Sequence, residues 1–107
     1  MKQISPTDLA AWLADATRLQ PALLDVREAW EYGICHIQGS QHMPMGSVPA
    51  RLSELDPQAE LVVICHHGAR SAQVGMFLER QGFDKVHNLA GGVAGWAAQV
   101  DPAMPQY

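Results

Sequence analysis

The segment LVVICHHGARS, residues 61–71, decides how this chain folds. Its first four residues are large and aliphatic and three of them are β-branched, a composition typical of a strand buried on both faces. Cys65 follows at once, and a turn of six residues from Cys65 to Arg70 leads into a helix expected over 70–81. In open α/β sheets, ligands bind at the carboxyl ends of such strands. The segment therefore predicts an α/β fold with a candidate site at Cys65.

Predicted strands and helices alternate along the rest of the chain. Ser5 and Pro6 are the residue types of a helix start, and this first helix should end near Thr17. Strands are expected at 22–26, 41–43 and 85–89, with short helices at 28–32, at 50–55 and after Gly91-Gly92. This alternation implies a mainly parallel sheet.

The composition limits the classes of protein to consider. A chain of 107 residues makes one domain, which we place at 1–100, followed by a loosely held tail at 101–107. The net charge of −4 and the lack of a basic run disfavour nucleic acid and anionic membranes as partners. No apolar run approaches the roughly 20 residues of a membrane span, and the first residues lack the apolar stretch of a signal peptide. We therefore expect a cytoplasmic protein, with a monomer as the starting assumption.

Cys65 has the sequence surroundings of a catalytic nucleophile. At a strand-to-helix turn, backbone N–H groups can point toward its sulfur, which favours the thiolate over the thiol and attracts an anionic substrate. Substrate contacts are expected from the turn and the helix start, namely His66, His67, Gly68, Ala69, Arg70 and Ser71. The alternative is that Cys65 is only a buried core cysteine. The Cys-x4-Arg spacing with an internal glycine argues against that alternative.

Three residues of this segment have chemistry that suits such a site. Gly68 tolerates a turn with positive φ or a close backbone approach. Arg70 adds a permanent charge on a planar fork suited to oxyanions. Ser71 can cap the helix or donate to a bound anion.

Four segments, in order and in spacing, resemble the rhodanese family of thiosulfate sulfurtransferases. LDVRE at 24–28 is similar to its Asp-x-Arg strand end, and Cys65 to Arg70 is similar to its active loop. EY at 31–32 followed by HIQGS at 36–40 resembles Glu-Tyr…Gly-His-Ile-x-Gly-Ala, and GGVAGW at 91–96 resembles Gly-Gly-x-x-x-Trp. The likeness extends over residues 2–97.

The resemblance implies a three-layer α/β domain, with a five-stranded, mainly parallel sheet and helices on both faces. It also implies an enzyme without a cofactor, in which Cys65 takes sulfur from a small anionic donor such as thiosulfate and passes it, as a persulfide, to cyanide or a thiol. A protein could be the donor or acceptor instead, which would make the chain a persulfide carrier or regulatory module. Six-residue loops are associated with sulfur transfer and seven-residue loops with phosphatases and arsenate reductases, so this loop favours sulfur.

The roles of several other residues have two interpretations each. Asp25 and Arg27 should lie at the same sheet edge as Cys65, either as an ion pair that supports the loop or as substrate contacts. The side chains of His66 and His67 either contact the substrate or point into solvent. Cys35 stands where the family usually has glycine. It is either a small buried residue or a resolving thiol that attacks the Cys65 persulfide or forms a disulfide with Cys65. Adjacent ligands cannot easily share one tetrahedral ion, so no metal site is expected.

Overall fold

The computed structural model describes residues 1–107 and contains one five-stranded sheet in the order β1-β5-β4-β2-β3. All four strand pairings are parallel. The strands are β1 (Lys2–Ile4), β2 (Ala22–Asp25), β3 (Gln41–His42), β4 (Leu61–Ile64) and β5 (Val86–Leu89). The aliphatic strand β4 is central and every residue of it is buried, as its composition predicts.

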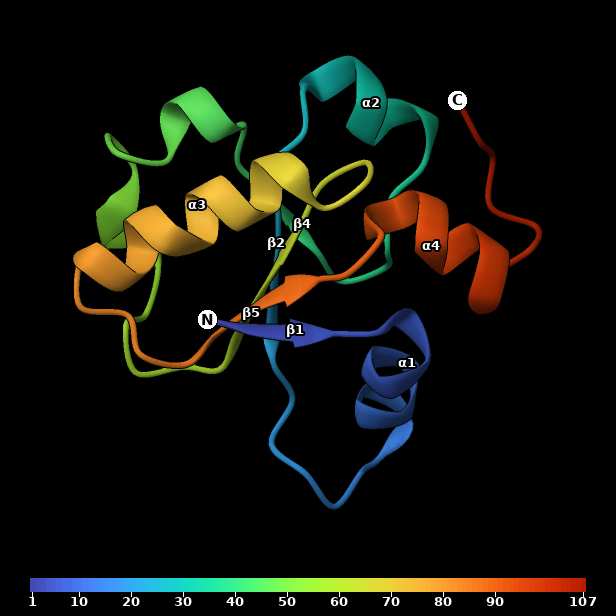
Figure 1. The fold of residues 1–107 in the computed structure, drawn as a ribbon, viewed down its shortest axis with the longest axis horizontal. Helices are drawn as coiled ribbons and strands as arrows, with labels where there is room; N and C mark the ends of the chain where they lie inside the picture. Colours follow the sequence, from blue (N-terminus) through green and yellow to red (C-terminus); the bar gives the residue numbers. More distant parts are fainter.

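Helices cover both faces of the sheet, which confirms the predicted three-layer α/β fold (Figure 1). On one face, α1 (Pro6–Ala14) packs beside α4 (Gly92–Gln99) over a core that includes Leu9, Ile64 and Trp96. On the other face, α3 (Ala69–Arg80) packs on β4 and β5 with the short 3-10 helices η1 (Met45–Ser47) and η2 (Leu52–Glu54) nearby. The remaining helix is α2 (Ala29–Ile34). None of these helices is long and apolar enough to cross a membrane.

Helix α1 begins where the sequence predicts and ends earlier than predicted. The Ser5 hydroxyl accepts a hydrogen bond from the Asp8 backbone N–H at 3.1 Å, as an N-cap should. The helix ends at Ala14 rather than near Thr17, because Asp15 is extended and its side chain binds the Thr17 backbone N–H at 3.0 Å. Such local side-chain bonds compete with the helix.

Strand β1 is an element that the pattern of residues does not predict. Its three residues include two polar, exposed side chains, Lys2 and Gln3, and so lack the apolar run of a buried strand. Pairing with β5 forms this strand, in the register Lys2↔His87 to Ile4↔Leu89. It is an edge strand, whose formation depends on a partner distant in sequence.

The tail at 101–107 differs from the expectation that it is loosely held. The Met104 side chain is 8% exposed and belongs to the same core cluster as Trp96. The Asp101 backbone N–H donates to the Trp96 carbonyl at 3.0 Å, and Tyr107 makes side-chain hydrogen bonds described below. Single apolar residues among prolines show no periodicity, which is why their burial is not visible in the sequence.

Candidate active site

Cys65 follows the last residue of β4 and is 1% exposed. The Gly68 backbone N–H donates a hydrogen bond to its Sγ atom at 3.0 Å. Gly68 adopts φ 108°, a conformation that residues with a Cβ rarely take, and it precedes the first residue of α3. The sequence therefore needs glycine at this position to turn a backbone donor onto the sulfur.

The other N–H groups of the loop have no protein acceptor. Those of His66, His67, Ala69 and Arg70 make no hydrogen bond to another protein atom. Ala69 and Arg70 open α3, where the first N–H groups have no intrahelical partner. The loop thus carries one donor on the sulfur and further donors available to an anion.

Ser71 and Asn88 form a polar pair beside the sulfur. The Ser71 Oγ atom lies 3.2 Å from the Cys65 Sγ atom, and its hydroxyl donates to the Asn88 Oδ1 atom. The Asn88 amide nitrogen donates to the Gly68 carbonyl at 3.2 Å. The single hydroxyl proton can serve only one acceptor at a time. While the Ser71 hydroxyl donates to Asn88 it cannot also donate to the sulfur, and rotation of the hydroxyl would supply a donor to a Cys65 thiolate.

The guanidinium of Arg70 is bound to the carboxylate of Glu31. Its Nη1 and Nη2 atoms donate to the two carboxylate oxygens at 2.7 and 2.8 Å. These bonds, with that from the Glu28 backbone N–H, lower the pKa of Glu31 to about 2 against the opposing effect of burial. The fork that we expected to hold an oxyanion therefore holds a protein carboxylate, and it fastens the end of the loop to α2.

Asp25 and Arg27 form a fully buried ion pair at the end of β2. The Arg27 Nη2 atom donates to the Asp25 carboxylate at 2.7 Å and to the Cys35 carbonyl at 2.6 Å. Burial alone would lower the pKa of Arg27, but its hydrogen bonds to Asp25 and Tyr107 raise that pKa above the ordinary value. Ile64 pairs with Asp25 in the sheet, so both strands end at the edge that carries Cys65, as predicted.

Tyr107 joins the two ion pairs. Its hydroxyl accepts from the Arg27 Nη1 atom at 3.0 Å and donates to the Glu31 Oε2 atom at 2.8 Å. Its ring stacks on the His66 ring, with centroids 3.9 Å apart. Burial raises the pKa of Tyr107 to about 12, opposed by Arg27 and assisted by Glu31. The phenol therefore keeps its proton at neutral pH and remains a donor to Glu31.

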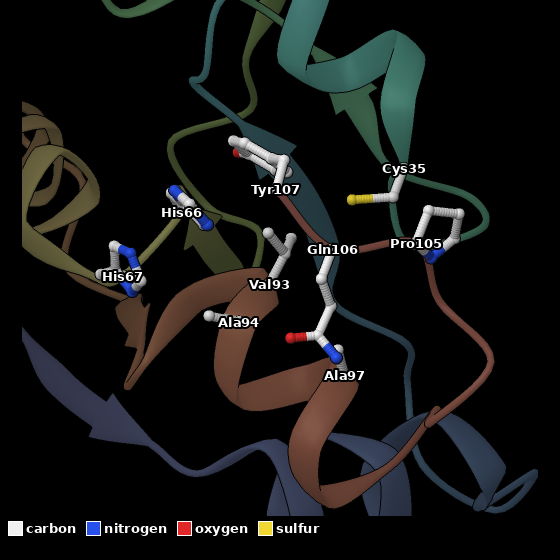
Figure 2. A pocket seen from close by; sticks show the side chains of 9 residues that line it. All are labelled: Cys35, His66, His67, Val93, Ala94, Ala97, Pro105, Gln106 and Tyr107. Carbon is white, nitrogen blue, oxygen red and sulfur yellow. The ribbon is translucent and has the colours of Figure 1, made fainter.

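A pocket of about 110 Å³ lies beside the active loop (Figure 2). His66 and His67 form one side, α4 forms the floor, and Tyr107 lies opposite the α4 side chains. Burial, and then the neighbouring His67, lower the pKa of His66, so its ring is uncharged at neutral pH. The pocket is lined by Cys35, His66, His67, Val93, Ala94, Ala97, Pro105, Gln106 and Tyr107.

The start of α4 packs directly on the active loop. The Val93 and Ala94 backbone N–H groups donate to the carbonyls of Cys65 and His66 at 2.9 and 3.1 Å. A Cβ atom on Gly92 would lie 2.4 Å from both carbonyl oxygens. Glycine at position 92 is therefore needed for this close approach.

Comparison with known proteins agrees with this arrangement. The rhodanese-like domain family matches residues 5–99. The chain is 38% identical to the thiosulfate sulfurtransferase GlpE of Actinobacillus pleuropneumoniae, over 79% of each chain. A rhodanese-like domain protein from Staphylococcus aureus superposes with a TM-score of 0.83, at 29% identity, covering 90% of this chain and 91% of that one.

The chain belongs to the rhodanese-like family. It also matches longer relatives, being 40% identical to the putative sulfur carrier protein YrkF of Bacillus subtilis over 74% of this chain. It spans only 43% of YrkF, and 26% of the probable adenylyltransferase/sulfurtransferase MoeZ of Mycobacterium tuberculosis, to which it is 35% identical.

The two thiols of this rhodanese-like domain lie in different surroundings. Cys35 is 7% exposed, lines the pocket, and has its Sγ atom 3.8 Å from the Arg27 Nη1 atom. It packs in the core cluster of α1 and α4, whereas Cys65 packs in the cluster on the other face of the sheet. Both are free thiols. A resolving role for Cys35 stays a prediction.

Three residues of the site were not predicted from the sequence, namely Glu31, Asn88 and Tyr107. Asn88 is a polar residue inside the otherwise apolar end of β5, and that break in the pattern was a usable signal. Glu31 lies in a family-like segment, but nothing local indicates its partner Arg70. Tyr107 had no signal, because it lies at the end of a proline-containing tail. No three His, Cys, Asp or Glu side chains lie close enough to hold a metal ion.

Proposed function

We propose that this rhodanese-like domain is a sulfurtransferase that moves sulfane sulfur from thiosulfate or a similar donor to cyanide or a thiol through a persulfide on Cys65. The Cys65 thiolate attacks the outer sulfur of the donor and forms a new S–S bond. The sulfur–sulfur bond of thiosulfate breaks, and its electron pair leaves with sulfite. The acceptor then attacks the terminal sulfur of the persulfide, and Cys65 leaves as the thiolate.

The observation that carries this proposal is the hydrogen bond from the Gly68 N–H to the Cys65 Sγ atom at 3.0 Å, inside a loop with further free N–H groups. Fixed backbone dipoles stabilise a negative sulfur in both half-reactions without reorganising. Arg27 and Arg70 are each paired with a carboxylate, so neither offers an unpaired charge to the donor. The loop N–H groups are therefore the main attraction for an anionic donor.

The second candidate function is a persulfide carrier or regulatory domain that exchanges sulfur with another protein. Two observations favour it over a general enzyme. Cys65 is almost fully buried, which limits random encounter with small donors, and one similar protein bears the name of a sulfur carrier. A carrier would form the persulfide but turn over slowly with thiosulfate and cyanide.

Steady-state turnover distinguishes the two functions. Purified protein is mixed with thiosulfate and cyanide, and thiocyanate is followed over time in parallel with Cys65→Ser. The sulfurtransferase proposal predicts repeated turnovers that the substitution abolishes. Slow formation of thiocyanate by a protein that nevertheless acquires the Cys65 persulfide supports the carrier, and turnover that survives Cys65→Ser contradicts both.

The role of Cys35 is tested separately. Persulfide is formed on the wild-type protein and on Cys35→Ser, excess donor is removed, and the decay of the persulfide is followed by intact mass. A resolving thiol predicts a longer persulfide lifetime in Cys35→Ser. Equal lifetimes reject that role and leave Cys35 as a buried pocket residue.

A further inference from the structure

Asn88 of β5 lies on the same face of the sheet as the Cys65 side chain. Side chains alternate along a strand, and Val86, two positions earlier, belongs to the core cluster that contains Cys65. In the sheet Asn88 pairs with Val63, two residues before Cys65. Asn88 is only 3% exposed. A buried amide is therefore placed where it can reach the groups around the reactive sulfur.

The partners of the Asn88 amide fix its orientation. Its nitrogen donates to the Gly68 carbonyl at 3.2 Å and to the Gln3 Oε1 atom at 2.9 Å, and its oxygen faces the Ser71 hydroxyl. A backbone carbonyl can only accept a hydrogen bond, so the amide nitrogen has to face Gly68. The amide oxygen can also only accept, so the hydroxyl donates to it. The Ser71 proton is therefore directed toward β5.

The Cys65 sulfur is a second acceptor for the same proton. The Ser71 Oγ atom lies 3.2 Å from the Cys65 Sγ atom, and Ser71 is fully buried. The hydroxyl has one proton, so a bond to the Asn88 oxygen and a bond to the sulfur exclude each other. A charged thiolate attracts this proton more strongly than an uncharged sulfur does. The direction of the hydroxyl therefore depends on the charge of Cys65 and on the strength of Asn88 as an acceptor.

We propose that Asn88 is a positioning residue that acts through Ser71: its amide oxygen accepts from the hydroxyl while the Cys65 Sγ atom is uncharged, and loses that bond to the thiolate. The proton stays on the Ser71 oxygen, and only its acceptor changes. The inference rests on the proposed function for one point, that Cys65 alternates between a thiolate and a persulfide. In the persulfide the terminal sulfur bears the charge and the Sγ atom is uncharged. Asn88 thus holds the hydroxyl in the persulfide state and weakens its bond to the free thiolate.

The pH dependence of Cys65 alkylation tests this competition. The rate with iodoacetamide is followed by peptide mass, which separates Cys65 from Cys35. The midpoint of its pH profile is compared, because altered access to the sulfur changes the maximal rate and not the midpoint. Asn88→Leu removes the competing acceptor and should lower the midpoint by about half a pH unit or more. In a Ser71→Ala background the same substitution should not lower it, since no hydroxyl is left to redirect.

Two further variants control the test. Gln3→Leu removes a partner of the same amide but leaves the Asn88 oxygen on Ser71, so it should keep the wild-type midpoint. Asn88→Asp keeps the size of the side chain and makes the acceptor charged. It should raise the midpoint, and by more when Ser71 is present than in Ser71→Ala. This variant keeps the inference testable if Asn88→Leu does not fold.

The dependence on Ser71 separates this role from a purely structural one. A midpoint that Asn88→Leu leaves unchanged or raises overturns the inference. So do shifts of equal size with and without Ser71, in either Asn88 variant. The expected shifts in a protein that takes up no sulfur from thiosulfate would uphold the competition for the Ser71 proton and reject the sulfurtransferase proposal.

Discussion

Arg70, the last residue of the active loop, is bound through both terminal guanidinium nitrogens to Glu31 of α2, at 2.7 and 2.8 Å. The loop is therefore fastened at two points: Gly68 turns onto the Cys65 sulfur, and Arg70 is clamped to a neighbouring helix. Tyr107, in the C-terminal segment 101–107, donates a hydrogen bond to the same carboxylate. Glu31 thus connects three segments that are far apart in the sequence.

Replacing Glu31 with glutamine should destabilise the fold by about 1–3 kcal/mol, because charge-assisted hydrogen bonds to Arg70 and Tyr107 are lost. The free energy of unfolding in urea measures this. Glu54→Gln is the matched control, since Glu54 pairs with Arg51 on the surface and both are exposed to a third or more. Its effect should stay below about 1 kcal/mol. Equal effects of the two substitutions would show that the hydrogen bonds of Glu31 to Arg70 and Tyr107 add nothing to the stability of the fold.

The contribution of Glu31 to the free energy of unfolding should also depend on pH. The pKa of Glu31 is about 2 in the folded chain, against an ordinary value of 4.5. Because the folded pKa is the lower one, the contribution to stability is complete above about pH 4.5 and is lost as the pH falls toward about 2. The difference in unfolding free energy between wild type and Glu31→Gln, measured from pH 7 to pH 3, should shrink below pH 4.5. A difference that stays constant over this range contradicts the assigned pKa.

Ser71 should assist the thiolate. Ser71→Ala removes the one hydroxyl that lies within hydrogen-bond distance of the Cys65 sulfur, 3.2 Å away. We expect persulfide formation on Cys65 to slow by about tenfold, which corresponds to about 1.4 kcal/mol of lost stabilisation. Ser53→Ala, on exposed η2, controls for loss of a hydroxyl. The rate of sulfur transfer from thiosulfate in a single turnover is the measurement, and an unchanged rate in Ser71→Ala rejects the role.

Gly92, which packs on the active loop, should tolerate alanine far less well than Gly33 of α2. Gly92→Ala places a Cβ atom 2.4 Å from the carbonyl oxygens of Cys65 and His66, in a backbone with φ 59°. It should cost at least about 2 kcal/mol of folding free energy. Gly33→Ala is the control, because Gly33 lies inside α2 with open space around it. That change should be neutral or stabilising by up to about 1 kcal/mol. Similar melting temperatures for the two variants would contradict the packing of α4 on the loop.

The sequence allowed prediction of what depends on neighbouring residues. The strand before Cys65, the glycine turn and helix α3 are continuous in the chain, so composition and spacing were enough to predict them. The edge strand β1, the burial of Met104 and the pairing of Arg70 with Glu31 depend on contacts between distant segments. Residue type at one position carries no information on such a partner. For that reason, the sequence predicted Arg70 as a substrate contact and residues 101–107 as a loosely held tail.

The central claim is that Cys65 carries sulfur, and peptide-level mass spectrometry tests it most directly. The protein is treated with thiosulfate, alkylated and digested, and the peptides that contain Cys65 and Cys35 are weighed separately. The account predicts one added sulfur on the Cys65 peptide, removed by cyanide, and none on the Cys35 peptide. A Cys65 peptide that never gains sulfur, or sulfur found only on Cys35, would contradict it.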